Sequence, residues 1–166
     1  MNRFSGEDTG ATLQLRLRNA RRIAIVGVGD ELLPFDRLGM VAAKKIDQLH
    51  LLHVAVFFAG TVPESITAPL RRYRPDHTIF LDAADMGAPS GTIAVIDPRN
   101  MQADLFSTHV LPLSVVMDYI EQEIGSGVTL LGIQPDSTNP ENGLSEEDLV
   151  YLERNLQILS DVLQNR

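Results

Sequence analysis

A strand, an acidic loop and a helix follow one another near the start of this chain, and their order limits the possible folds. Residues 23–28 (IAIVGV) form an apolar run without polar alternation, which is typical of a strand buried on both faces of a sheet. Three acids, Asp30, Glu31 and Asp36, stand in the loop that follows, and an amphipathic helix begins near Leu38. Ligands of open α/β sheets bind beyond the carboxyl ends of the strands, and carboxylates are costly to bury without a metal, a base or water. The segment therefore predicts an α/β fold with a functional site in this loop.

The rest of the sequence repeats this alternation of strand and helix. We expect a first helix over 13–20, although the stretch 13–17 would also suit a strand. Further strands are expected at 54–58, 78–81, 91–96 and 128–133, and helices at 38–49, 63–70, 112–124 and after the capping residue Ser145. The pattern predicts a three-layer α/β/α sandwich, with about five mostly parallel strands in a twisted sheet and helices on both faces.

Length and composition narrow the class of protein. The 166 residues suit a single domain, 1–166, in which a polar N-terminal extension and short helix (1–21) precede the core (22–166). The absence of cysteine excludes disulfides, thiolate zinc sites and cysteine nucleophiles. The formal net charge of −8 argues against a nucleic acid or an anionic membrane as partner. Without a signal peptide or an apolar run of about 20 residues, we expect a cytoplasmic protein outside the membrane. The leucine stripe of the last helix suits a core better than an interface, so we expect a monomer.

Three residues at the ends of predicted elements are candidates for a site. Asp36 lies in the first acidic loop, Asp82 directly follows the strand 78–81, and His109 precedes the helix 112–124. We place all three loops at the same edge of one sheet, so we expect these side chains to lie close together. Two carboxylates and an imidazole can bind zinc, nickel or another first-row divalent ion with coordination positions left open.

Each of these residues also has a purely structural interpretation. Asp36 can cap the helix that starts near residue 37. Asp82 can be a turn residue or can pair with Arg71 or Arg72. His109 can be a solvated side chain in front of a helix. Sequence spacing alone leaves these alternatives open.

Two further features carry less functional information. The pair Gly27-Val28-Gly29 lacks the third glycine of a dinucleotide-binding loop, whose place Leu32 takes, and the neighbouring acids would repel a phosphate. His77 stands in Pro75-Asp76-His77, and we expect it in a surface turn.

Four segments form an ordered pattern along the chain: Val28–Gly39 (VGDELLPFDRLG), Ile79–Gly91 (IFLDAADMGAPSG), Ser107–Leu113 (STHVLPL) and Leu131–Asp136 (LGIQPD). This pattern resembles that of the nickel–iron hydrogenase maturation proteases, and it is most similar to the hydrogenase-3 type branch. The resemblance covers nearly the whole chain from Arg22 onward.

The resemblance implies an endopeptidase that removes the C-terminal extension of a nickel–iron hydrogenase large-subunit precursor after nickel has been inserted. It also implies that Asp36, Asp82 and His109 carry the catalysis and bind a divalent metal, expected to be nickel supplied by the precursor. Such a metal either activates water and polarises the scissile carbonyl or serves to recognise the loaded precursor. A carboxylate pair of Asp36 and Asp82 that shares one proton is a further possibility, which leaves His109 without a role.

The residues near Asp36 and Asp82 leave open which group acts as a base and which substrate is bound. Asp30, Glu31 or Asp85 is available as a base or to orient a ligand. Asp30 stands where the family usually has asparagine, and Pro34, Phe35 and Arg37 also depart from its pattern. These departures leave the identity of the substrate open. A non-catalytic chaperone that binds the metal-loaded large subunit is the alternative function. A small-molecule hydrolase is less favoured because the sequence shows no serine nucleophile elbow.

Overall fold

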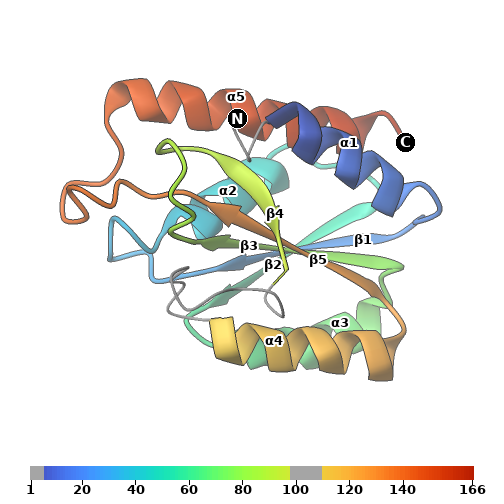
Figure 1. Ribbon diagram of the computed structural model, residues 1–166. Coiled ribbons are helices and arrows are strands. Elements are labelled where there is room, and N and C mark those ends of the chain that lie inside the picture. Colours follow the sequence, from blue (N-terminus) through green and yellow to red (C-terminus); the bar gives the residue numbers. More distant parts are fainter. Residues whose placement is uncertain (1–5, 98–109) are drawn as a thin grey trace.

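The computed structural model describes residues 6–97 and 110–166, which form a twisted sheet between two layers of helices (Figure 1). The strands are β1 (Ile23–Val28), β2 (Val54–Gly60), β3 (His77–Ala83), β4 (Ile93–Ile96) and β5 (Gly127–Ile133). The helical elements are α1 (Gly6–Leu17), α2 (Leu38–Asp47), the 3₁₀ turn η1 (Pro63–Ile66), α3 (Thr67–Tyr73), α4 (Val110–Tyr119), the π-helical turn η2 (Ile120–Ile124) and α5 (Glu146–Gln164). The predicted α/β sandwich is confirmed.

The strand order explains where the site can form. The order in the sheet is β2-β1-β3-β5-β4, and β1 pairs in parallel with both β2 and β3. β3 pairs in parallel with β5, whereas the edge strand β4 runs antiparallel to β5. Four strands therefore present their carboxyl ends at one edge of the sheet, which is the left edge in Figure 1.

Two apolar cores fill the spaces on either side of the sheet. In β1, Ile23 and Ile25 belong to the core under α1, α2 and α5, and Ala24 and Val26 belong to the core over α3 and α4. All residues of β1 and β3 are buried, as an apolar run without polar alternation predicts.

Several element boundaries differ from the expectations. The first helix begins earlier, at Gly6, and buries Leu13 and Leu17 in the core, which excludes the strand alternative. The helix expected over 63–70 is divided into η1 and α3. β3 continues to Ala83, so Asp82 lies within this strand and not behind it.

The last helix follows the sequence pattern closely. Ser145 is its N-cap, and a capping box joins the side chain and backbone of Ser145 to those of Asp148. The leucine stripe packs into the core, except that Leu149 is exposed. In the described part of the chain, no helix is long and apolar enough to cross a membrane.

The prediction that His77 lies in a surface turn is wrong. His77 is the buried first residue of β3, and its Nε2 lies 2.8 Å from Oγ1 of Thr129. Burial, followed by the positive charges of Arg16 and Arg166, lowers the pKa of His77 to about 4.

Candidate active site

Two glycines let helix α2 pack unusually close to the ends of β1 and β3. A Cβ atom on Gly39 would overlap the carbonyl oxygens of Leu81 and Val28, and one on Gly27 would lie 2.7 Å from the Cβ of Ala43. The first turn of α2 therefore packs against the C-terminal parts of these two neighbouring strands. Leu81 immediately precedes Asp82, so this contact sets the loop before α2 beside the end of β3.

The loop between β1 and α2 folds back on itself and buries Asp36. Gly29 has a φ of 131°, and a Cβ at this position would overlap the carbonyl oxygen of Asp36. Asp36 is only 6% exposed, and its Oδ2 accepts a hydrogen bond of 2.9 Å from the backbone N–H of Asp30. The N-cap residue of α2 is Arg37, whose side chain makes no capping hydrogen bond. Asp36 therefore does not occupy the N-cap position of α2.

Asp82 is a buried carboxylate inside the sheet. It is 1% exposed and pairs in register with Gly132 of β5. Its neighbours Leu81 and Ala83 pack into the core on the α2 side, so strand alternation directs Asp82 toward the α3 and α4 side. The turn interpretation of Asp82 is thus wrong.

The third candidate, His109, lies outside the described residues. The described chain resumes at Val110 with helix α4, whose N-terminal end lies below the carboxyl edge of the sheet in Figure 1. Among the described residues, no three histidine, aspartate or glutamate side chains are grouped to hold a metal ion. Convergence of His109 with Asp36 and Asp82 remains a prediction.

A buried glutamine at the end of β5, which the sequence did not single out, organises the loop after β3. The Oε1 of Gln134 accepts hydrogen bonds from the backbone N–H groups of Met86 and Ala88, at 2.6 and 3.3 Å. Its Nε2 donates to Asp85 Oδ1 and to Ser137 Oγ, both at 3.1 Å. Gln134 thus joins the ends of β3 and β5 where the site is expected. The only sequence signal for this role is a polar residue at the end of an apolar strand.

The three acids considered as a base have different surroundings. The side chain of Gln134, and then the N–H of Gly87 and the Ser137 hydroxyl, lower the pKa of Asp85, which makes it a weaker base. Glu31 forms an exposed ion pair with Lys44, and Asp30 Oδ1 accepts a hydrogen bond of 2.9 Å from the N–H of Leu32. These contacts give Asp85, Glu31 and Asp30 structural partners at the rim of the site.

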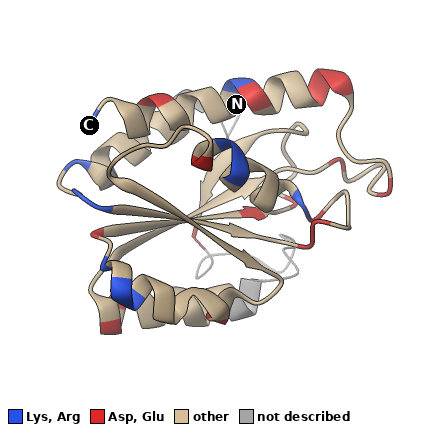
Figure 2. Cartoon of the chain, turned by 180° about the vertical axis from the view of Figure 1, so that it is seen from behind, with Lys and Arg blue, Asp and Glu red and all other residues tan. Residues whose placement is uncertain are grey.

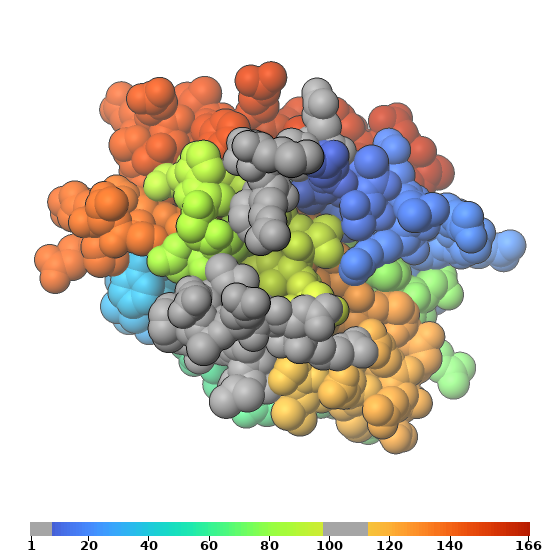
Figure 3. All heavy atoms as spheres, in the orientation of Figure 1, coloured from blue at the N-terminus to red at the C-terminus, as the bar shows by residue number. Residues whose placement is uncertain are grey.

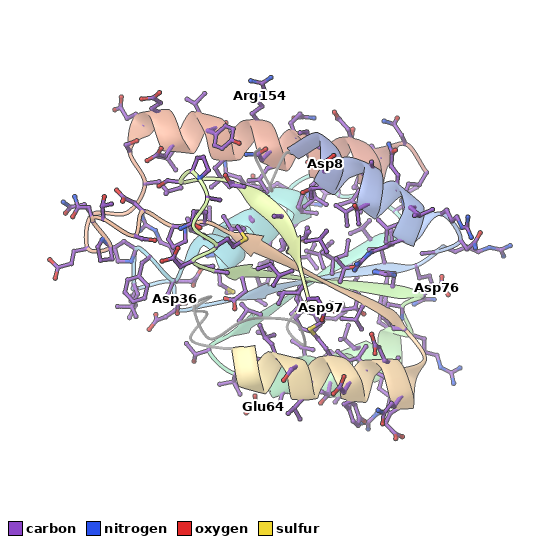
Figure 4. The ribbon with its side chains drawn as sticks, viewed as in Figure 1. Asp8, Asp36, Glu64, Asp76, Asp97 and Arg154 are labelled. Carbon is purple, nitrogen blue, oxygen red and sulfur yellow. The ribbon has the colours of Figure 1, made fainter. Side chains whose placement is uncertain are left out.

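The figures show how charge and loops are arranged around this edge. Most acidic positions in the loops lie at one end of the sheet in Figure 2, and basic positions gather at the other end. Figure 4 shows Asp36 at the carboxyl edge, opposite Asp76 at the far edge. In Figure 3 the loop after β5 lies against the loop after β1, consistent with the approach of Gly143 to Pro34 and Arg37.

Comparison with known proteins identifies the family. The family model described as HycI, hydrogenase maturation protease, matches residues 40–160. The chain belongs to the hydrogenase maturation protease family. It is 35% identical over 111 residues to the hydrogenase 3 maturation protease of Escherichia coli, a match that covers 66% of this chain and 70% of that protein.

Solved structures of the family agree with this assignment. The crystal structure of the nickel–iron hydrogenase maturation protease HycI from Thermococcus kodakarensis superposes with a TM-score of 0.79 at 30% identity, over 93% of this chain and 99% of that one. The solution structure of the endopeptidase HycI from Escherichia coli has a TM-score of 0.69 at 30% identity, over 84% of this chain and 90% of that one. Sequence and fold thus agree that this chain is a maturation protease.

Proposed function

We propose that this protease removes the C-terminal extension of a nickel-loaded nickel–iron hydrogenase large-subunit precursor. The observation that carries the proposal is the pair of buried carboxylates, Asp36 and Asp82, at the carboxyl edge of neighbouring strands in a chain of this family. A positively charged group offsets the cost of keeping two buried acids ionised, so this edge suits such a group of the substrate.

Asp36, Asp82 and His109 are the residues that we propose to contact the nickel of the precursor. Oxygen and nitrogen donors of this kind bind first-row divalent ions. Because the ion belongs to the substrate, a precursor without nickel lacks the group that these side chains recognise. Nickel held there also supplies a Lewis acid next to the scissile peptide. The lowered pKa of Asp85 makes that carboxylate a weak candidate to accept a proton from water.

The experiment compares two forms of the precursor. The protein is incubated with nickel-loaded and with nickel-free large-subunit precursor, and intact masses are followed over time. We expect a C-terminal mass loss from the loaded form only. A stable complex without mass loss would replace the protease by the chaperone alternative. Equal cleavage of both forms would remove nickel from the recognition step.

A further inference from the structure

The two edge strands of the sheet differ in length and in the elements that lie beside them. β4 has four residues and lies beside α1 and α5, and the Thr9 hydroxyl donates a 3.1 Å hydrogen bond to the Ile93 carbonyl. β2 has seven residues, and among the described residues no other strand pairs with its outer side. Edge strands of soluble proteins are usually short, charged, interrupted by proline or covered.

The sequence of β2, VAVFFAG, is neither short nor charged nor interrupted by proline. It has no charged residue and no proline from Val54 to Gly60, and the only irregularity of its pairing with β1 comes between Phe58 and Gly60. Most of β2 is half-buried, and Phe58 is 42% exposed, whereas β1 is fully buried. The strand therefore offers an uncharged, open edge of unusual length.

Hydrogen bonding to β1 defines which backbone groups of β2 face outward. The N–H of Ile23 donates to the carbonyl of His53 at 2.9 Å, so alternation turns residues 53, 55 and 57 toward β1. Val54, Val56 and Phe58 then direct their N–H and C=O groups toward the open edge. The N–H of Val54 already donates to Leu51 at 3.2 Å, which leaves Val56 and Phe58 as the positions for an added strand.

The open edge leads into the candidate active site. The carbonyl of Gly60, the last residue of β2, accepts a 2.8 Å hydrogen bond from Gly29, the first residue of the loop that carries Asp36. Two exposed large apolar residues follow this junction in the sequence, Val62 after β2 and Leu32 in the Asp36 loop. A chain extended along β2 would therefore arrive at the carboxyl edge next to Asp36.

We propose that β2 binds the C-terminal segment of the hydrogenase large-subunit precursor as an added β-strand and so guides it to the site. This inference rests on the proposed function. Strand addition fits because backbone hydrogen bonds give affinity without charged anchors, and because an extended chain presents its peptide bonds for cleavage. The uncharged side chains of β2 favour a segment whose own side chains are mostly apolar or small.

A charge on the edge provides the first test. In Phe58→Lys, the lysine places a charge beside the apolar strand that would add at this edge, which should weaken its binding. We therefore expect KM for the nickel-loaded precursor to rise about tenfold with kcat unchanged. Leu52→Lys is the matched control, because Leu52 is fully exposed and precedes β2. We expect this control to retain the wild-type KM and kcat.

Amide exchange of the unmodified protein provides a second test. With precursor in excess, a short deuterium pulse read at single-residue resolution should show slowed exchange at Val56 and Phe58. Ala55 and Phe57, which bond to β1, should exchange slowly with or without precursor. The inward amides thus serve as internal controls for folding.

The outcomes separate this inference from the proposed function. Normal KM in Phe58→Lys together with unchanged exchange at Val56 and Phe58 would overturn strand addition, even if the wild-type protein cuts the precursor. Slowed exchange that depends on protease concentration alone would assign the edge to a second copy of this chain. This result would also overturn strand addition by the precursor. If the wild-type protein causes no mass loss, the proposed function fails. Exchange at Val56 and Phe58 with bound precursor would still show whether β2 takes up an added strand.

Discussion

At the scale of single residues, Asp36 and Asp30 offer a comparison within one loop. The carboxylate of Asp36 is buried and accepts the N–H of Asp30, whereas the carboxylate of Asp30 accepts the N–H of Leu32 at the surface. An asparagine oxygen can accept the same hydrogen bond in either place but carries no charge. Asparagine variants at these two positions can therefore distinguish the effect of the side-chain charge from the effect of its hydrogen bond.

We expect Asp36→Asn to fold normally and to lower the rate of precursor processing by more than about 100-fold, because the substrate cation loses a charged partner. Asp30→Asn should process the precursor within about threefold of the wild-type rate. Mass loss of the precursor measures the rate, and circular dichroism checks folding. A folded Asp36→Asn protein with wild-type activity would remove this carboxylate from the site.

The sequence singles out Asp36 and Asp82 as candidates but does not show the surroundings of His77 and Gln134. Asp36 follows the apolar run 23–28 and Asp82 comes at the end of the apolar run 78–81, and such positions are visible in a local pattern. The partner of His77 is Thr129, and Gln134 bonds to residues 46 to 49 positions away. Contacts of this range depend on the packing of β3 beside β5, which no local pattern contains.

At the scale of elements, the close packing of α2 on β1 and β3 sets the position of the Asp36 loop. A methyl group on Gly39 has no space, because the carbonyl oxygens of Leu81 and Val28 occupy its place. Helix α2 can accept it only by moving away from both strands. Such a movement would carry the Asp36 loop away from Asp82.

Gly39→Ala is therefore expected to destabilise the fold by about 2 kcal/mol or more and to reduce processing of the precursor. Gly125→Ala is the control, because its Cβ would meet no atom within 4 Å and adds only the strain of a residue with a φ of 75°. That strain costs about 1 kcal/mol and should leave activity unchanged. Urea unfolding and mass loss of the precursor measure the two effects. Equal stability and activity of the two variants would contradict the packing argument.

The sequence predicts the type of each helix or strand better than its boundaries. Apolar runs and helical spacing identified all five described strands and the main helices, because both signals are local. The division at Ile66 and the extension of β3 to Ala83 depend on tertiary contacts and on pairing with β5. The extension matters for the site, since it makes Asp82 part of the sheet.

At the scale of the whole molecule, stability should depend on pH through His77. Its pKa is about 4 in the folded protein, below the ordinary value of 6.5, because burial disfavours the charged ring and Arg16 and Arg166 repel it. Between these two values the unfolded chain binds a proton that the folded protein does not. The contribution of neutral His77 to stability is therefore present in full above about pH 6.5 and is lost as the pH falls toward 4.

This loss should reach about 3 kcal/mol, because each unit of pKa difference corresponds to about 1.4 kcal/mol. The pKa values of Asp76 and Asp85 are also lowered, but from an ordinary value of 3.8, so these carboxylates affect stability mainly below pH 4. Urea unfolding at pH 7 and pH 4.5 measures the change in the free energy of unfolding.

The matched variant is His77→Gln, whose amide can still bond to Thr129 but does not titrate. This variant should be less stable than the wild type at pH 7, because Gln does not fill the volume of the ring that packs against Gly127. Its stability should nevertheless change little between pH 7 and pH 4.5. An equally steep fall in the variant would assign the acid sensitivity to other groups, namely the three remaining histidines and the carboxylates.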